Sequence, residues 1–170
     1  MADGPRYRVQ FRRRREGRTD YRTRLALLKG GEPRAVVRTS LRNVVVQLVG
    51  FDASGDKVLA SAEARELPKL GWTGFTRNTP SAYLTGLLAG TRAKAAGVES
   101  AVLDLGRQMP QKGGRLFAAL QGLVDAGLEI PHGEEVAPAE DRIRGAHIGD
   151  EVAANFDAVK GKILETAGRE

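Results

Sequence analysis

Residues 78–106 read NTPSAYLTGLLAGTRAKAAGVESAVLDLG and contain a strong helix signal followed by a strand signal. The stretch predicts a helix that Thr79 caps, with Pro80 at the first helical position and Gly97 at the end. The apolar stripe of this helix comprises Leu84, Leu87, Leu88 and Thr91. AVLDLG, from Ala101, is typical of a short buried strand. A strand, a helix and a buried strand in succession indicate a right-handed crossover with a parallel strand pair.

Three predicted strands precede this helix, over Ala35–Ser40, Val44–Phe51 and Lys57–Glu63. Arg42-Asn43 forms a turn, and DASGD forms a hairpin loop. Alternation assigns to the apolar face Val37, Thr39, Val58, Ala60 and Ala62, and to the polar, basic face Arg38, Ser40, Lys57 and Ser61.

A second amphipathic helix follows in GGRLFAALQGLVDAGL. Its apolar residues are Leu116, Phe117, Leu120, Leu123 and Val124. We expect the two helices to cover the apolar face of the sheet and to leave the basic face open. The fold class is therefore α/β: a mixed, mainly antiparallel sheet with helices on one face, a basic N-terminal arm and a helical C-terminal extension.

The N-terminus carries nine arginines in its first 24 residues, four of them as Arg12–Arg15. Residues 1–17 have no stable period, so we expect an extended arm that is disordered when free. A helix begins at Thr19 or Asp20 and ends at Gly30-Gly31. Its stripe is Tyr21, Leu25 and Leu28.

Charge is divided unevenly along the chain. Residues 1–42 carry a net charge of +9 and residues 43–170 a net charge of −3. A near-neutral body with a basic arm points to a polyanionic partner. Guanidinium groups bind phosphates, and rings such as Tyr7 and Phe11 stack on unpaired bases, which favours RNA over a membrane. The alternative is a solvated basic tail that serves only solubility or localisation.

The composition also limits the location and the partners of the chain. There is no cysteine, which fits a reducing cytoplasm. No apolar run is long enough to span a bilayer, so no membrane partner is expected.

After Ile130-Pro131-His132 the composition becomes polar and acidic, and PHGEEVAPAED is interpreted as a linker. A last helix is predicted over 148–164, and we expect its apolar face to pack on a surface outside the chain. That face comprises Val152, Phe156, Val159 and Ile163. The predicted organisation is a basic RNA-binding arm and helix over 1–30, an α/β core over 31–132 and a C-terminal extension over 133–170.

No catalytic set, nucleotide-binding motif, metal site or cofactor site is predicted. His132 and His147 fall beside turns. Asp104 is either a general base at a strand end or a turn-forming or helix-capping carboxylate. Gly86 and Gly90 allow a helix to approach the sheet closely.

Two further features leave alternatives open. Gly113-Gly114, beside Lys112 and Arg115, can hold phosphate at a helix N-terminus or can simply form a flexible helix entry. In the predicted loop Leu67–Arg77, Trp72 of GWTGF either packs at the edge of the core, which we favour, or stacks on RNA.

The segments RTDYRTRLALL, VVRTSLRNVVVQLV, GDKVLASA, GWTGFTRNTPSAYLTGLLAG and KGGRLFAALQGLVDAGLEIPH occur in this order. Together they resemble the family of large-subunit ribosomal proteins that bind 5S ribosomal RNA, numbered eighteen in the bacterial series, in its archaeal form. The resemblance runs from about residue 5 to 132. It implies a non-enzymatic protein that docks 5S RNA onto large-subunit RNA in the central protuberance. Implied neighbours include the other 5S-binding ribosomal protein.

The resemblance assigns RNA contacts to the arm and to the first strand with its turn. These residues are Arg6, Tyr7, Arg8, Phe11, Arg12, Arg13, Arg14, Arg15, Arg18, Tyr21, Arg22, Arg24, Arg38, Ser40, Arg42 and Asn43. From their positions in the pattern we add Lys57, Arg77 and Lys112.

Two other functions remain open from the residues alone. One is a small nucleotide-dependent α/β enzyme that uses the strand ends near Asp104 to Lys112, which requires a pocket of convergent polar groups there. The other is a nonspecific nucleic-acid-binding protein, which would not need a loop as particular as GWTGF.

Overall fold

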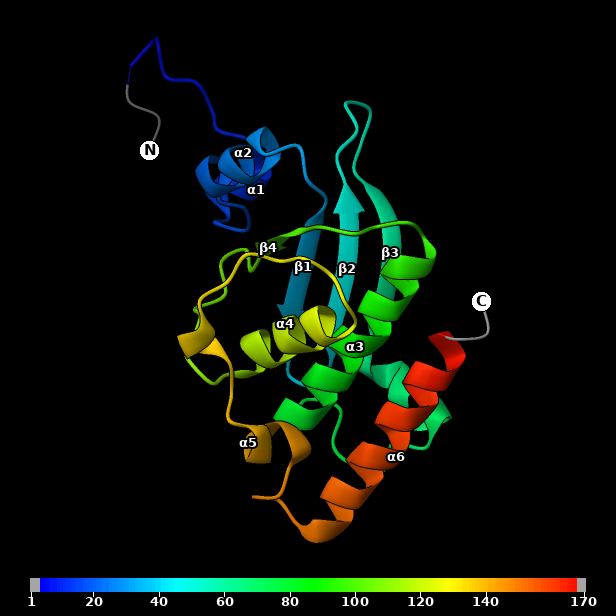
Figure 1. The fold of residues 1–170 in the computed structure, drawn as a ribbon. Helices are drawn as coiled ribbons and strands as arrows, with labels where there is room; N and C mark the ends of the chain where they lie inside the picture. Colours follow the sequence, from blue (N-terminus) through cyan, green and yellow to red (C-terminus); the bar gives the residue numbers. More distant parts are fainter. Residues whose placement is uncertain (1–3, 168–170) are drawn as a thin grey trace.

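The computed structural model describes residues 4–167, so residues 1–3 of the predicted arm and 168–170 of the predicted extension lie outside it. Its centre is a four-stranded sheet in the order β3-β2-β1-β4 (Figure 1). The strands are β1 (Arg34–Thr39), β2 (Val44–Gly50), β3 (Lys57–Glu63) and β4 (Val102–Asp104). β2 pairs antiparallel with β1 and β3, and β4 pairs parallel with β1. The predicted mixed sheet and its parallel pair are therefore confirmed.

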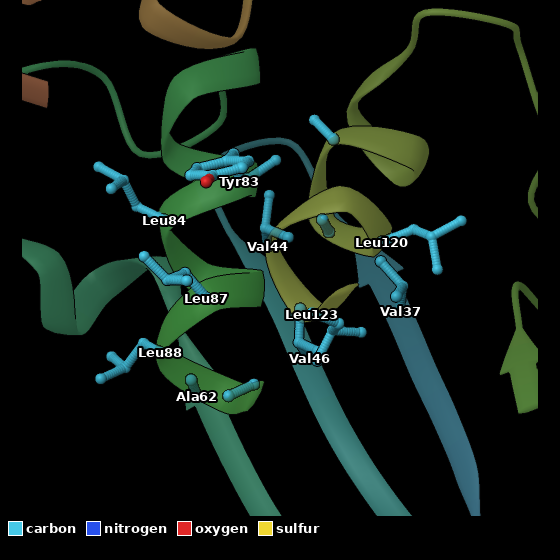
Figure 2. Close-up of a cluster of buried hydrophobic side chains, with 14 of the residues drawn as sticks. Val37, Val44, Val46, Ala62, Tyr83, Leu84, Leu87, Leu88, Leu120 and Leu123 are labelled. Carbon is cyan, nitrogen blue, oxygen red and sulfur yellow. The ribbon is translucent and has the colours of Figure 1, made fainter. Parts of the chain in front are cut away.

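Two helices cover one face of the sheet, as predicted: α3 (Thr79–Ala95) and α4 (Arg115–Asp125). Side chains from the strands and from both helices meet in one core (Figure 2). The fully or almost fully buried residues of this core include Val37, Val44, Val46, Ala62, Leu84, Leu87, Leu120 and Leu123. Burial of this apolar surface is the main force that joins the helices to the sheet.

Val58 is an exception to the predicted alternation, because its side chain is 54% exposed. The pairing of β2 with β3 shifts between Leu48 and Val49, so that Ala60 faces Leu48 but Val58 faces Val49. An irregularity of this kind changes which residues oppose each other across the strands. The apolar face of β3 therefore begins at Ala60.

The N-terminus of α3 differs from the prediction by one residue. Asn78, and not Thr79, is the N-cap, and its Oδ1 accepts a hydrogen bond from the Ser81 backbone N–H at 2.9 Å. Pro80 therefore occupies the second helical position. The helix ends just before Gly97, whose φ of +78° suits glycine.

Glycines let α3 and α4 touch along their backbones. A Cβ atom on Gly86 would lie 2.1 Å from the Ala119 carbonyl oxygen, and one on Gly122 would lie 2.2 Å from the Tyr83 carbonyl oxygen. The prediction that Gly86 and Gly90 let the helix approach the sheet was therefore wrong, because the atoms close to both glycines belong to α4 and to Ala126 at its end.

A third layer comes from the C-terminal part of the chain, with the short 3₁₀ helix η2 (Glu134–Val136), α5 (Glu140–Arg144) and α6 (Asp150–Ala167). Neither η2 nor α5 was predicted within the linker. α6 lies against α3 and against the 3₁₀ helix η1 (Ala64–Leu70) (Figure 1). Its buried residues are Phe156, Val159 and Ile163. The surface that receives α6 thus lies within the chain itself.

The predicted loop Leu67–Arg77 begins inside η1. The Glu66 side chain accepts a hydrogen bond from the Glu63 N–H at 2.8 Å, and this capping box starts the helical turns in spite of Pro68. Trp72 follows and is only 2% exposed, with its indole N–H directed to the Phe75 carbonyl oxygen at 3.4 Å. Of the two alternatives for Trp72, the free protein adopts core packing.

The N-terminal segment forms α1 (Arg12–Arg15) and α2 (Tyr21–Lys29), neither of which has a buried residue. Asp20 caps α2 by accepting hydrogen bonds from the backbone N–H groups of Arg22 and Thr23. The single turn of α1 was not predicted within the extended arm. Among residues 4–167, no helix combines the length and the apolar composition needed to cross a bilayer.

Candidate nucleic-acid interface

A chain of ion pairs fixes α2 to the sheet. Asp56, in the β2–β3 hairpin, lies 2.8 Å from Arg24 of α2 and 2.6 Å from Arg34 of β1. Arg34 also lies 2.9 Å from Asp104 of β4, which lies 2.9 Å from Arg38. These five side chains join α2, the hairpin and two strands, so the base of the arm is held against the sheet.

Asp104 is the central anion of this chain. Burial by itself raises its pKa, but the hydrogen bonds and charges of Arg38 and Arg34 and the Gly106 N–H outweigh burial and hold the pKa below its usual value. The Gly106 N–H donates to Asp104 Oδ1 at 2.8 Å. The turn-forming interpretation therefore holds, and the two arginines are partners that the sequence analysis missed.

Arg38 was predicted to contact RNA from an open sheet face. Its guanidinium donates to the Val37 carbonyl at 2.8 Å, to the Asp104 carbonyl at 2.6 Å and to the Asp104 carboxylate. The side chain is still 41% exposed. Arg38 therefore has a structural role in addition to any contact with RNA.

The arm presents most of the predicted cations to solvent. The exposed arginines are Arg6, Arg8, Arg12, Arg13, Arg14, Arg15, Arg18 and Arg22. Between and beside them, Tyr7, Phe11 and Tyr21 are also exposed. Glu16 pairs with Arg12 at 3.7 Å and with Arg18 at 2.8 Å, which neutralises only part of the charge. The arm thus offers both phosphate-binding and base-stacking groups.

The predicted residues of the first turn divide into two kinds. Arg42 is exposed, whereas Asn43 is 6% exposed and donates to Glu63 Oε2 at 3.1 Å. Ser40 Oγ accepts a hydrogen bond from the Asn43 backbone N–H at 3.1 Å. The structure therefore places Ser40 and Asn43 within the turn, with Arg42 as its outward cation.

The remaining predicted cations lie apart from the arm. Lys57 lies 2.6 Å from Asp52 in the hairpin. Lys112 lies 2.9 Å from Glu135. Arg77 lines a polar cleft at the N-termini of α3 and α4 and is partly buried.

This cleft has a volume of about 680 Å³ and occupies the place that the enzyme alternative requires. Its lining includes Arg77, Arg115, Arg142, His147, Gln108 and Gln111, but not Asp104. The polar groups are thus mainly cations and amides rather than an acid–base pair with a nucleophile. Within residues 4–167, no group of three or more His, Cys, Asp or Glu side chains could hold a metal ion.

Comparison with known proteins identifies relatives over almost the whole chain. The family described as ribosomal large subunit proteins 60S L5 and 50S L18 matches residues 5–100. The chain is 54% identical over 169 residues to large ribosomal subunit protein uL18 of Methanococcoides burtonii, covering 96% of this chain and 98% of that protein. It is 57% identical over 148 residues to the uL18 proteins of Korarchaeum cryptofilum and Methanoregula boonei, covering 87% of this chain and 76% and 85% of those proteins.

Proposed function

The chain belongs to the family of large-subunit ribosomal proteins L5 and L18, and we propose that it binds 5S ribosomal RNA and attaches it to the large-subunit ribosomal RNA in the central protuberance. As a member of this family it is a structural constituent of the large subunit in cytoplasmic ribosomes, with a non-enzymatic role. We include the other 5S-binding ribosomal protein among its proposed neighbours.

The proposal rests on one observation: the arm is exposed, and ion pairs hold α2, which follows it, against the sheet. Eight exposed arginines and three exposed aromatic rings lie between Arg6 and Arg22. Arg24, which follows them, is tied to Asp56 at 2.8 Å. An exposed polycation gains affinity for phosphates through counterion release, and the ion pair of Arg24 with Asp56 fixes where the arm leaves the core.

The remaining predicted contacts belong to the same proposal. Arg38 and Arg42 extend the cationic surface along β1 and its turn, and Ser40 and Asn43 hold the turn in place. Lys57 and Lys112 take part through their exposed ammonium groups, which can exchange Asp52 and Glu135 for phosphate.

The test compares the full chain with a variant that lacks residues 1–18. If the arm neutralises about six phosphates, the logarithm of the affinity for 5S ribosomal RNA falls with the logarithm of salt concentration at a slope between about −4 and −5. The truncated chain should keep its melting temperature, because α1 has no buried residue, but should bind much more weakly and with a shallower slope.

An unrelated folded RNA of the same length serves as the specificity control. Equal affinity for both RNAs would favour a nonspecific nucleic-acid-binding protein. Unchanged affinity of the truncated chain, or a slope near zero for the full chain, would contradict the proposed function.

A further inference from the structure

The polar cleft between the N-termini of α3 and α4 carries an unbalanced positive charge. Three arginines line it, Arg77, Arg115 and Arg142, together with His147. None of the lining residues is acidic, and none of the three arginines forms an ion pair with another residue of the described part of the chain.

Two of these arginines are held close to each other. Arg115 Nη1 donates to the Arg77 carbonyl oxygen at 3.2 Å, and Arg77 Nη1 donates to the Leu41 carbonyl oxygen at 3.4 Å. Burial, and then the charge of Arg77, hold the pKa of the Arg115 guanidinium below its usual value. Two cations in a partly buried cleft repel each other, so an anion between them is stabilised by both.

Some hydrogen-bond donors of the residues around the cleft have no acceptor within residues 4–167. The Arg77 Nε–H is buried and has no hydrogen-bond acceptor among residues 4–167. The N–H groups of Gly113 and Gly114 donate to the Val136 and Gln111 carbonyl oxygens. Gly114 is the N-cap of α4 and has no side chain to cap the helix, so the N–H groups in the first turn of this 11-residue helix have no side-chain acceptor. Guanidinium groups and helix N–H groups that line one cleft are suited to a phosphate group.

Apolar side chains with high exposure lie in and beside this cleft. Phe75 and Met109 line the cleft and are 60% and 82% exposed. Leu41, whose carbonyl receives Arg77, is 79% exposed. An exposed aromatic ring beside a phosphate-binding group is the arrangement that stacks an unpaired base while its backbone is held.

The cleft also connects with the arm through one loop. Gly17 of the arm lies beside the Arg107 guanidinium, at 3.6 Å from a Cβ built on the glycine. Arg107 lines a pocket in which arginines, among them Arg13 and Arg18, outnumber the acidic residues Asp20 and Asp104. The next residue, Gln108, lines the cleft. Cationic groups therefore run from the arm past Arg107 to the cleft, which suits a nucleic-acid backbone better than an isolated small anion.

We propose that this cleft is a second RNA-binding site, which holds one backbone phosphate between Arg77 and Arg115 and stacks an unpaired base on Phe75. The inference rests on the proposed function, because that function supplies the RNA. It adds Arg107, Arg115, Arg142 and Phe75 to the interface. It places the phosphate at the first turn of α4, because the N–H groups of Gly113 and Gly114 already donate to the Val136 and Gln111 carbonyl oxygens.

The test uses the full chain and two probes, 5S ribosomal RNA and archaeal large-subunit ribosomal RNA. Arg115→Gln should weaken binding to at least one probe by about tenfold and lower its salt slope by about one, since one phosphate contact is lost. Phe75→Ala should weaken the same interaction at least about fivefold without changing the slope, because stacking involves no counterion. Arg65→Gln, an exposed arginine outside the cleft, removes the same charge and should bind like the parent chain.

Thermal melting of each variant separates binding from folding. If Arg115→Gln melts early, Arg142→Gln replaces it, because Arg142 is exposed. Variants of the cleft that bind both probes like Arg65→Gln would overturn the inference while leaving the proposed function intact. If the parent chain failed to bind 5S ribosomal RNA, that result would instead contradict the proposed function.

AMP serves as the probe for a free nucleotide. We expect no saturable binding of AMP below about 1 mM, because a single phosphate contact and one stacked base give limited affinity. Saturable AMP binding that Arg115→Gln abolishes, with RNA affinity unchanged, would assign the cleft to a small nucleotide and overturn the RNA site.

Discussion

The guanidinium of Arg34, in the first position of β1, donates to the carboxylate of Asp104, in the last position of β4, at 2.9 Å, and both side chains are buried. The residues are 70 positions apart in the sequence. The parallel register, which pairs Arg34 with Val102 and Val36 with Asp104, brings them to the same face of the sheet. The ion pair between Arg34 and Asp104 therefore depends on the parallel pairing of β1 with β4.

Asp104→Asn should lower the free energy of unfolding at pH 7 by roughly 3–5 kcal/mol, because it leaves the buried Arg34 and the neighbouring Arg38 without their shared anion. Chemical denaturation measures the change. Asp52→Asn is the matched control and should cost less than about 1 kcal/mol, because it removes the ion pair with the exposed Lys57 while the new amide oxygen can still accept the hydrogen bonds from Ser54. Equal losses for the two variants would contradict a special role for Asp104.

The same pair predicts a dependence of stability on pH. The pKa of Asp104 in the folded chain lies below its usual value. The ionised carboxylate therefore stabilises the fold fully above the pKa of the unfolded chain, which is about 4. The stabilisation is lost as the pH falls through the folded pKa. The stability difference between the parent chain and Asp104→Asn should therefore shrink between about pH 5 and pH 2. A difference that stays constant over this range would argue against the assigned ionisation.

Gly86→Ala should destabilise the fold by at least about 1–3 kcal/mol, because the new methyl group meets the Ala119 carbonyl at 2.1 Å and forces α3 and α4 apart. Gly161→Ala in α6 is the control, since a Cβ there meets nothing within 4 Å. That change should stabilise the chain by about 0.5–1 kcal/mol through helix propensity. Melting temperatures that move in the same direction would contradict the assigned helix contact.

Trp72→Ala should lower stability by about 3–5 kcal/mol, the usual cost of removing a buried aromatic side chain. Since Trp72 is the only tryptophan, its fluorescence reports on this site alone. We expect a blue-shifted emission that resists quenching by iodide in the free chain and shifts to that of exposed indole on unfolding. A water-like emission from the folded chain would place the ring outside the core.

Phe156→Ala should cost about 3–5 kcal/mol, because its ring is buried and lies 5.4 Å from the Tyr83 ring of α3. Leu164→Ala, on the exposed side of the same helix, should change stability by less than about 1 kcal/mol. The free energies of unfolding of the two variants in urea show whether α6 is packed firmly on α3 or only loosely attached. If both substitutions had small effects, α6 would contribute little to the core.

Val37→Ala tests which face of the sheet is buried. It removes methyl groups from the core and should cost about 1–3 kcal/mol, with RNA affinity unchanged. Lys57→Ala should do the reverse, because the side chain is exposed and its pair with Asp52 contributes little to folding. Denaturation and RNA binding are measured on the same samples. Similar effects of the two variants would contradict the assignment of faces.

Much of the fold follows from local patterns in the sequence. The period of the apolar residues and the Pro–Gly boundaries are sufficient to predict α3 and α4, and alternation predicts β1 to β3, because each pattern reflects the geometry of one element. The cationic arm is equally evident, because none of the nine arginines in the first 24 residues lies on an apolar stripe. These features depend on residues within a few positions of one another.

Every feature that joins distant segments depends on how the elements pack. Asp104 acquires Arg34 and Arg38 through strand register, Gly86 meets α4, and α6 finds its partner in α3. The cleft likewise exists only because two helix N-termini and the loop before α4 converge, which places Arg77 against Arg115. No local period encodes such pairs, because their contact depends on how elements pack after the chain between them has folded.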